Sequence, residues 1–355
     1  MSRRVLVVVL LAAAAAVLAA ASPAGAVTKR ATAGATARNA PRQFDANAFF
    51  PRRITVHTGD RVRWAFEGFH TVTFPARGQT PPAFVVPDMQ RPVQGLTDAA
   101  GAPFWFNGQP TLIANPMAAA PVGPRTYDGS TYVNSGVPTG NRPKPYTLRF
   151  TKTGVFTYYC LVHPGMKATV AVVPRRRPVP NRRADAAAAR LQLSRLVAQA
   201  RRAAARPAPS GATVQAGRSA TGFSLQAFFP ATLRVTTGQA VTFTMAGQPR
   251  EEIHTVTFGP AALLSQLEFL APLPGTTPPV IGVNPQAAYP SDPPTMPPSY
   301  DGGNHGNGFL NLGVLDNDRA SPQPVSATLT FTKAGTYSYE CLIHPRMDGR
   351  VVVTG

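Results

Sequence analysis

Hydrophobic and polar positions alternate along several short stretches of the chain, a period typical of β-strands with one buried face. Ile54-Thr55-Val56 and Arg61-Val62-Arg63-Trp64 flank Thr58-Gly59-Asp60, which predicts a strand, a turn and a second strand. Residues 147–159 alternate in the same way, and residues 169–173 supply a further strand. Short alternating strands joined by proline- and glycine-rich connections predict an all-β fold, a sandwich or a small barrel.

The whole pattern occurs twice. HTVTF stands at residues 70–74 and again at 254–258, and FFP stands at 49–51 and again at 228–230. Cys160-Leu161 has its counterpart in Cys341-Leu342, and the strands expected in the second copy are at 233–235, 241–244, 327–339 and 350–353. Matching segments in one order, with small length differences between them, predict a tandem duplication of one domain.

Two kinds of segment interrupt this pattern. Between the HTVTF strand and the next strong strand, each copy has a proline-rich stretch of about 70 residues, which is long for a loop of a compact domain. We expect an insertion with short local elements, including a helix at residues 261–270. Residues 174–220 separate the copies and are rich in arginine and alanine, with Asp185 as their only acid. Both residue types favour helix, so a basic linker helix is predicted over residues 184–205.

The first residues have the pattern of a secretory signal. Arg3 and Arg4 precede an unbroken apolar run from Val5 to Ala21, and Ala24-Gly25-Ala26 is a small-residue cleavage pattern. The alternative is a retained membrane anchor, but the run has the minimum length for one and the cleavage pattern argues against it. We expect an exported protein, periplasmic or extracellular and soluble after cleavage, with the general or the twin-arginine route left open.

These features divide the chain into five parts. They are a signal peptide (1–26), a flexible N-terminal segment (27–42), a first domain (43–174), a linker (175–218) and a second domain (219–355). The formal net charge is +19, and the linker supplies much of it. The linker is expected to be a solvated spacer, or else to contact an anionic cell-surface polymer, a membrane surface or an acidic partner protein. Nucleic acid is not expected as a partner of an exported protein.

The chemistry lies near the end of each copy, in a Cys-x-x-His-x-x-Met sequence. The residues are Cys160, His163 and Met166 in the first copy and Cys341, His344 and Met347 in the second. A thiolate, an imidazole and a thioether are ligands that copper prefers, and a blue-copper site needs two histidines. The repeat supplies the second histidine as His70 and His254, so we expect two copper ions per chain. A Cys160–Cys341 disulfide would leave the matched histidines and methionines unexplained, and zinc has no use for methionine.

Both copies resemble the cupredoxins, the blue copper family of plastocyanin and azurin. The Cys-x-x-His-Pro-x-Met spacing is most similar to that of amicyanin-like domains, and residues 51–64 resemble the early strands of the family. The resemblance implies two tandem Greek-key β-sandwiches with one type 1 copper each. It makes the histidines and the cysteine equatorial ligands and the methionine axial, which gives His70, Cys160, His163 and Met166, and His254, Cys341, His344 and Met347. The chain departs from the family in its long insertions, and at Phe66 and Met245, where relatives often carry asparagine.

The resemblance implies an electron carrier rather than an enzyme, with a redox partner protein. Copper sequestration or delivery is an alternative, and a copper oxidoreductase is a second one. Oxidases and nitrite reductases with cupredoxin repeats resemble each other in having His-x-His pairs and a histidine beside the ligand cysteine. Here Tyr159 and Leu161 flank Cys160, and the two unassigned histidines, His57 and His305, do not occupy matching positions.

Overall fold

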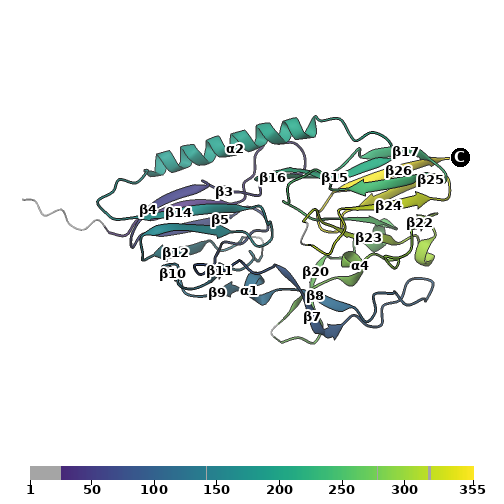
Figure 1. Cartoon of the computed structure of the whole chain (residues 1–355), viewed down its shortest axis with the longest axis horizontal. Helices are drawn as coiled ribbons and strands as arrows, with labels where there is room; N and C mark the ends of the chain where they lie inside the picture. The colour runs from purple at the N-terminus through teal and green to yellow at the C-terminus, as the bar shows by residue number, and fades with distance from the viewer. Residues whose placement is uncertain (1–24, 141, 278, 319–320) are drawn as a thin grey trace, which may run out of the picture.

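The chain folds into two β-sandwiches that lie side by side (Figure 1). The computed structural model describes residues 25–140, 142–277, 279–318 and 321–355, so the predicted signal peptide lies outside the described residues except for Gly25 and Ala26. A long helix runs along one side of the molecule, and a small sheet lies on the opposite side, between the sandwiches (Figure 1). No helix of the described ranges is long and apolar enough to cross a membrane. The described chain is therefore all-β with one long helix, as its alternating pattern predicts.

The first sandwich has two sheets with a shared core. One sheet has the order β10 (Thr126–Tyr127), β12 (Tyr146–Phe150), β5 (Arg61–Phe66), β1 (Thr28–Ala33), β3 (Phe49–Phe50). The other has the order β4 (Arg53–His57), β14 (Lys167–Val173), β13 (Gly154–Tyr159), β6 (Thr73–Phe74), β11 (Val133–Ser135), β9 (Pro121–Val122). Alternate residues of β5 are buried, which carries Trp64 into the core against Tyr158, with ring centroids 5.4 Å apart. The period of two in the sequence thus places one face of each strand in the core.

The second sandwich repeats this order of strands, with β2 added at one edge and, within its described residues, no counterpart of β9 at another. One sheet has the order β2 (Phe44–Asp45), β16 (Phe223–Phe229), β15 (Thr213–Ala220), β18 (Ala240–Thr244), β24 (Ser326–Phe331), β22 (Ser299–Tyr300). The other has the order β17 (Thr232–Thr236), β26 (Asp348–Thr354), β25 (Gly335–Glu340), β19 (His254–Phe258), β23 (Leu310–Leu315). Because β2 belongs to the first copy in sequence, its pairing with β16 joins the two sandwiches.

The N-terminal segment differs from its prediction. A flexible segment is predicted at residues 27–42, but β1 lies inside the first sheet, parallel to β5 and antiparallel to β3. Ala31 and Ala33 are buried in the core, and the buried Lys29 ammonium lies 2.5 Å from Asp185 of the linker. The sequence does not reveal this strand because its buried positions are small or polar residues. Its place depends on β5 and on the linker, which are distant in the chain.

The linker helix is α2 (Arg182–Ala204), close to its predicted bounds. Asn181 caps its N-terminus by accepting a hydrogen bond from the Ala184 amide at 2.9 Å. The helix is not a solvated spacer, because Leu196 and Ala200 are buried in a cluster with residues from both sandwiches. The buried members of that cluster are Ala46, Phe50, Leu196, Ala200, Phe223 and Leu225. One face of α2 therefore fixes the sandwiches to each other.

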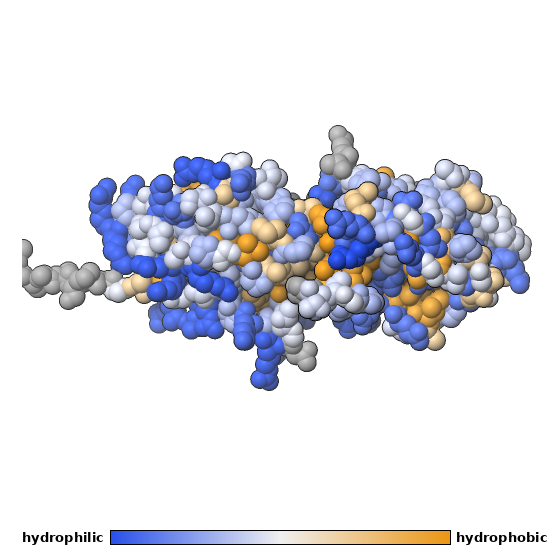
Figure 2. All heavy atoms as spheres, turned by 90° about the horizontal axis from the view of Figure 1, so that it is seen from below, coloured by the Kyte–Doolittle hydropathy of each residue, from blue (hydrophilic) through white to orange (hydrophobic). Residues whose placement is uncertain are grey.

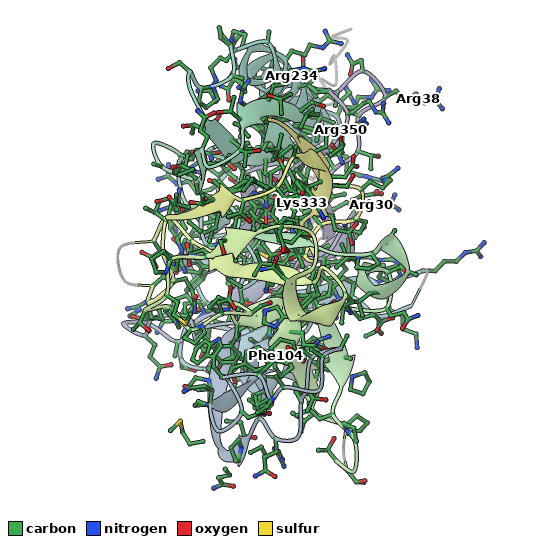
Figure 3. The ribbon with its side chains drawn as sticks, turned by 90° about the vertical axis from the view of Figure 1, so that its right-hand side faces the viewer. Arg30, Arg38, Phe104, Arg234, Lys333 and Arg350 are labelled. Atoms are coloured by element: carbon green, nitrogen blue, oxygen red, sulfur yellow. The ribbon has the colours of Figure 1, made fainter. Side chains whose placement is uncertain are left out.

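The two proline-rich insertions meet in a sheet of their own. Its order is β20 (Leu270–Pro272), β21 (Ile281–Val283), β8 (Pro110–Ala114), β7 (Val85–Pro92), and it combines strands of both copies. The insertions also contain α1 (Pro116–Ala119), β9, α3 (Ala261–Leu264), α4 (Pro285–Ala288) and a 3-10 turn, η1 (Asn304–Gly306). The helix expected at 261–270 is present but ends at Leu264. Phe104, which lies in the lower half of the view in Figure 3, packs with Phe309 of the other copy at a centroid distance of 6.2 Å.

Equivalent residues of the two copies face each other where the sandwiches meet. Residues 44–51 (FDANAFFP) align without a gap with residues 223–230 (FSLQAFFP). Asp45 of β2 lies opposite Ser224 of β16, and the rings of Phe44 and Phe223 stack with centroids 6.1 Å apart. In the insertion sheet, Ile113 lies opposite Gly282, and each stands two residues before a shared Asn-Pro. Contacts between equivalent positions indicate an approximate two-fold axis, as in an isologous dimer.

Basic side chains are spread over the exposed surface. Arg30, Arg38, Arg234, Lys333 and Arg350 are all exposed and come from both sandwiches (Figure 3). In the face seen in Figure 2, hydrophilic residues cover much of the end that holds the first sandwich. Apolar residues lie closer to the middle and over the second sandwich (Figure 2).

Candidate metal centres

Three of the four predicted ligands of the first copy come together inside the protein. The Nδ1 atoms of His70 and His163 are 3.0 Å apart, and the Cys160 Sγ lies 3.6 Å from His163 Nδ1 and 3.9 Å from His70 Nδ1. All three residues are buried. His70 precedes β6, whereas Cys160 and His163 belong to the loop between β13 and β14. The sheet pairing of β6 with β13 brings these distant segments together.

The second copy has the same geometry. The Nδ1 atoms of His254 and His344 are 3.1 Å apart, and the Cys341 Sγ lies 3.5 Å from His344 Nδ1 and 3.9 Å from His254 Nδ1. His254 begins β19, and the loop between β25 and β26 carries the other two residues. Both cysteines are buried and free, so the disulfide alternative is excluded.

Each methionine closes the loop that carries the cysteine. The Cys160 amide donates to the Met166 carbonyl at 3.0 Å, and the Met166 amide donates to the His163 carbonyl at 2.9 Å. Cys341, His344 and Met347 form the same two bonds at 2.9 and 3.2 Å. Met166 and Met347 are both buried, at 1% and 0% exposure, in the cores that contain the cysteines. The loop backbone therefore holds the thiolate and the imidazole at a fixed spacing.

In each site a threonine connects the first histidine ligand segment to the cysteine loop: Thr71 follows His70, and Thr255 follows His254. Sequence reasoning missed both threonines. The Leu161 amide donates to Thr71 Oγ1 at 2.8 Å, and the Thr71 amide points at the Cys160 Sγ at 3.4 Å. Thr255 makes both contacts in the second copy, at 2.8 and 3.4 Å. The shared HTVTF sequence carried this signal, since its threonines are identical in both copies. These contacts connect the two ligand segments of each site.

The charges of the sites favour a bound cation. Burial alone raises the pKa of the Cys160 thiol, but hydrogen bonds from His163 and His70 outweigh burial and hold the pKa well below its usual range. Burial and the two histidines act on Cys341 in the same directions, and its pKa is also well below the usual range. A thiolate is the form of cysteine that binds metals. In the metal-free chain, burial lowers the pKa of His163, but the negative charges of Glu252 and Cys160 raise it to about 9.

The Nε2 atoms of His70 and His254 pack against the backbone of a glycine. His70 Nε2 and His254 Nε2 are buried without a hydrogen-bond partner among the described residues. A side chain at Gly34 would meet His70 Nε2 at 2.5 Å, and one at Gly217 would meet His254 Nε2 at 2.3 Å. These equivalent glycines leave room for the rings and fix their orientation, with Nδ1 toward the cysteine.

Copper suits this donor set. One thiolate and two imidazole nitrogens, all buried and converging, are the equatorial ligands of a blue-copper site, which often adds a distant methionine. The nitrogens that converge are the Nδ1 atoms, and each has a lone pair available when the proton resides on Nε2. Neither remaining histidine joins a site. His57 Nε2 hydrogen-bonds the Arg177 carbonyl at 2.8 Å, and His305 Nδ1 lies 3.1 Å from Asp98 in the insertions.

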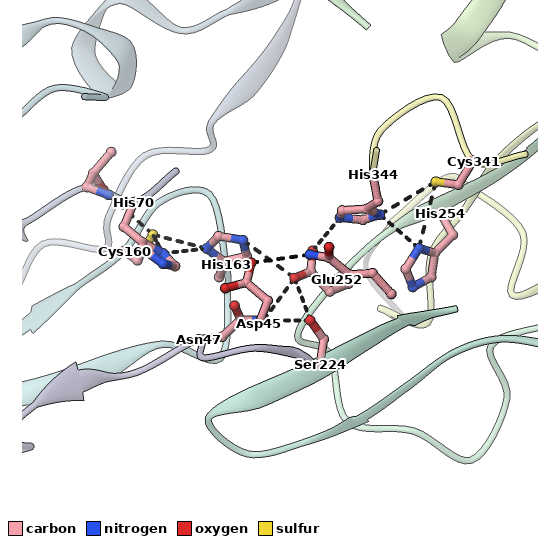
Figure 4. Close-up of polar contacts among 12 residues, drawn as sticks. Asp45, Asn47, His70, Cys160, His163, Ser224, Glu252, His254, Cys341 and His344 are labelled. Carbon is pink, nitrogen blue, oxygen red and sulfur yellow. Dashed lines mark hydrogen bonds and ion pairs between the residues drawn. The ribbon is translucent and has the colours of Figure 1, made fainter. Parts of the chain in front are cut away.

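One further group lies between the two centres. Asp45, His163 and Glu252 place possible ligand atoms within 4.8 Å of one another. Glu252 also contacts His344, so it connects the loops of both copies (Figure 4). Sequence reasoning missed Glu252, because it stands in a segment that differs between the copies.

Comparisons with known proteins give similarity to solved structures only. No family model and no curated protein match the chain. A Cu(I) structure of a methionine-to-glutamine mutant of amicyanin is 16% identical, with 41% of this chain and 82% of that chain covered and a TM-score of 0.22. An oxidised structure of a proline-to-alanine mutant of amicyanin is 17% identical, with 43% and 86% covered and a TM-score of 0.21. Each likeness spans less than half of this chain.

Proposed function

We propose that the chain is an exported copper protein with two type 1 sites that transfers electrons. The observation that carries the proposal is the duplicated donor set, one buried Cys Sγ with two His Nδ1 atoms within 4.8 Å in each sandwich. His70, Cys160, His163 and Met166 would hold one copper ion, and His254, Cys341, His344 and Met347 the other. Bound copper would supply one-electron chemistry between its Cu(I) and Cu(II) forms.

The protein's own residues support transfer over release of the metal. The predicted ligands of each site lie beside or at the start of a strand and on a short loop closed by two backbone hydrogen bonds. Thr71 and Thr255 restrain the cysteine loops, and the cores pack behind them. A rigid donor set changes little between oxidation states, which favours fast electron exchange.

The first experiment tests the metal assignment. Purified metal-free protein is titrated with Cu(II) while the visible spectrum and the copper content are measured. We expect two copper ions per chain and an intense thiolate-to-copper band. Cys160→Ser and Cys341→Ser should each remove one ion and about half of the band, since the two donor sets are separate. Copper binding without the band would contradict the type 1 assignment.

The second experiment separates a carrier from a copper store or donor. The loaded protein is reduced and reoxidised repeatedly beside a competing chelator. A carrier keeps both ions and exchanges electrons quickly with a small redox partner. Loss of copper at each reduction would favour sequestration or delivery, the alternative function for the same sites.

A further inference from the structure

The buried carboxylate of Glu252 lies between the two centres. Glu252 Oε2 is 3.2 Å from His344 Nε2, and Glu252 Oε1 is 3.5 Å from His163 Nε2. The opposite edges of these two imidazoles carry the Nδ1 atoms that face the cysteines (Figure 4). One side chain therefore reaches a predicted ligand of each sandwich.

Residues of both sandwiches hold this carboxylate in place. Asn47 Nδ2 donates to Glu252 Oε1 at 2.9 Å, and Ser224 Oγ donates to the same oxygen at 3.0 Å. All three residues are buried, with exposures of 1%, 0% and 6% for Asn47, Ser224 and Glu252. Hydrogen bonds to an ionised buried group are short and strong when the group is fully satisfied. Glu252 is thus a fixed part of the interface and not a mobile surface charge.

The position of Glu252 carries a carboxylate in one copy only. Residues 67–74 (EGFHTVTF) align with residues 251–258 (EEIHTVTF), so the counterpart of Glu252 is Gly68. Gly68 has a φ of +102°, and a side chain there would meet the His70 ring at 3.2 Å. A strict two-fold dimer would place either two such carboxylates or none beside the axis. Two copies joined in one chain can differ in sequence, and here one has Glu252 where the other has Gly68.

We propose that Glu252 is a positioning residue shared by both metal centres. It accepts the Nε2–H of His344 and lies 3.5 Å from His163 Nε2, and these two contacts turn the Nδ1 edge of each ring toward its own cysteine. Histidine ligands of metals commonly donate their other N–H to such a partner, and loss of the partner typically weakens metal binding about 10–100-fold. Glu252 belongs to the second copy in sequence and serves the first copy as well. This inference rests on the proposed function of the two sites.

The test measures each centre alone. In a Cys341→Ser background only the first centre can load, and in a Cys160→Ser background only the second can. Cu(I) affinity is measured by competition with a chromophoric chelator, with and without Glu252→Gln. We expect about a 10–100-fold loss of affinity at both centres. The loss at the first centre is decisive, because Glu252 lies between β18 and β19 of the second sandwich and would there act on a ligand of the first.

The matched control is Glu67→Gln. Glu67 stands three residues before His70, as Glu251 stands before His254, and it is exposed. Its substitution removes the same charge without removing a contact to a ligand, so Cu(I) affinity should stay within about twofold of its parent, well short of the loss that a missing histidine partner causes. Thermal unfolding of the metal-free variants is measured in parallel, because a purely structural role would change unfolding and leave affinity unchanged.

Asn47→Ala provides a second variant that keeps the carboxylate and removes one of its donors. It should weaken both centres in the same direction and by less, and it replaces Glu252→Gln if that variant does not fold. Unchanged affinity at the first centre in both variants would overturn the inference. A third copper ion lost with Glu252→Gln, while both centres keep their affinity, would overturn it as well. Wild-type protein that binds no copper would instead refute the proposed function.

Discussion

Asp45 and Ser224 occupy equivalent positions of the two copies and lie opposite each other in adjoining antiparallel strands. Asn47 and Gln226, which are also equivalent, make matching contacts across the same pair of strands. Asn47 Nδ2 donates to Ser224 Oγ at 3.4 Å, and Gln226 Nε2 donates to Asp45 Oδ2 at 3.2 Å. The sandwiches are therefore packed as an isologous pair within one chain. This packing buries His163 and His344 and directs both toward Glu252.

Thr71 and Thr255 should each be needed for the geometry of the site in their own sandwich. Thr71→Val keeps the shape of the side chain but removes the acceptor of the buried Leu161 amide. We expect a loss of about 1–3 kcal/mol in the free energy of unfolding, as for an unsatisfied buried donor. Urea unfolding of the metal-free chain measures this. In the Cys341→Ser background the copper band should also shift, whereas Thr255→Val in that background should leave the band unchanged.

Arg218 should be necessary for the attachment of α2. Its guanidinium is buried and donates to the carbonyls of Ala203, Arg206 and Pro207 at 2.8, 2.7 and 2.9 Å. Arg218→Met keeps much of the apolar stem but leaves these carbonyls without their donor, so we expect a loss of about 2–4 kcal/mol in unfolding free energy. Urea unfolding followed by circular dichroism measures it. Arg202→Met on the exposed side of α2 is the control, and an equal loss there would contradict the role of Arg218.

Glu251 should make the metal-free protein less stable as the pH rises. Burial raises the pKa of this carboxyl from 4.5 to about 7. Between these values the folded chain holds a proton that the unfolded chain has released, so stability falls as pH rises toward 7 and stays lower above it. Glu251→Gln removes the effect and should stabilise the protein by up to about 3 kcal/mol at about pH 8, with little change near pH 5. A difference that does not vary with pH in urea unfolding would contradict this prediction.

The exposed arginines of α2 should attract anionic surfaces. We propose this contact for Arg183, Arg190, Arg195 and Arg202, which are exposed while the opposite face of α2 is buried. Replacing all four by glutamine should weaken binding to anionic vesicles by at least about tenfold, and added salt should weaken wild-type binding steeply. Co-sedimentation with vesicles measures both. Glutamine at Arg30, Arg38, Arg234 and Arg350 changes the net charge equally, and an equal loss there would assign the effect to overall charge.

The sequence by itself determined the parts of the protein that depend on local pattern. The period of two predicted the all-β fold, alanine and arginine predicted α2, and the repeat pointed to His70 and His254 as partners of the cysteine loops. The structure has the strands and the helix, and it places His70 and His254 beside the cysteines, while their role as ligands stays a prediction. Strand, helix and ligand spacing can be read from the sequence because they are encoded by residues that are close in the chain or duplicated in it.

Only the tertiary structure decided how the two copies pack against each other and which residues their two centres share. β1 was missed because its buried residues are small or polar, and its place depends on β5. The contacts of Glu252 could not be inferred from the sequence, because Asn47, His163 and His344 come from three distant segments of the chain. Its counterpart Gly68 shows that the equivalent position of the first copy carries no carboxylate. The docking of the sandwiches, and not either copy alone, makes one carboxylate the neighbour of both centres.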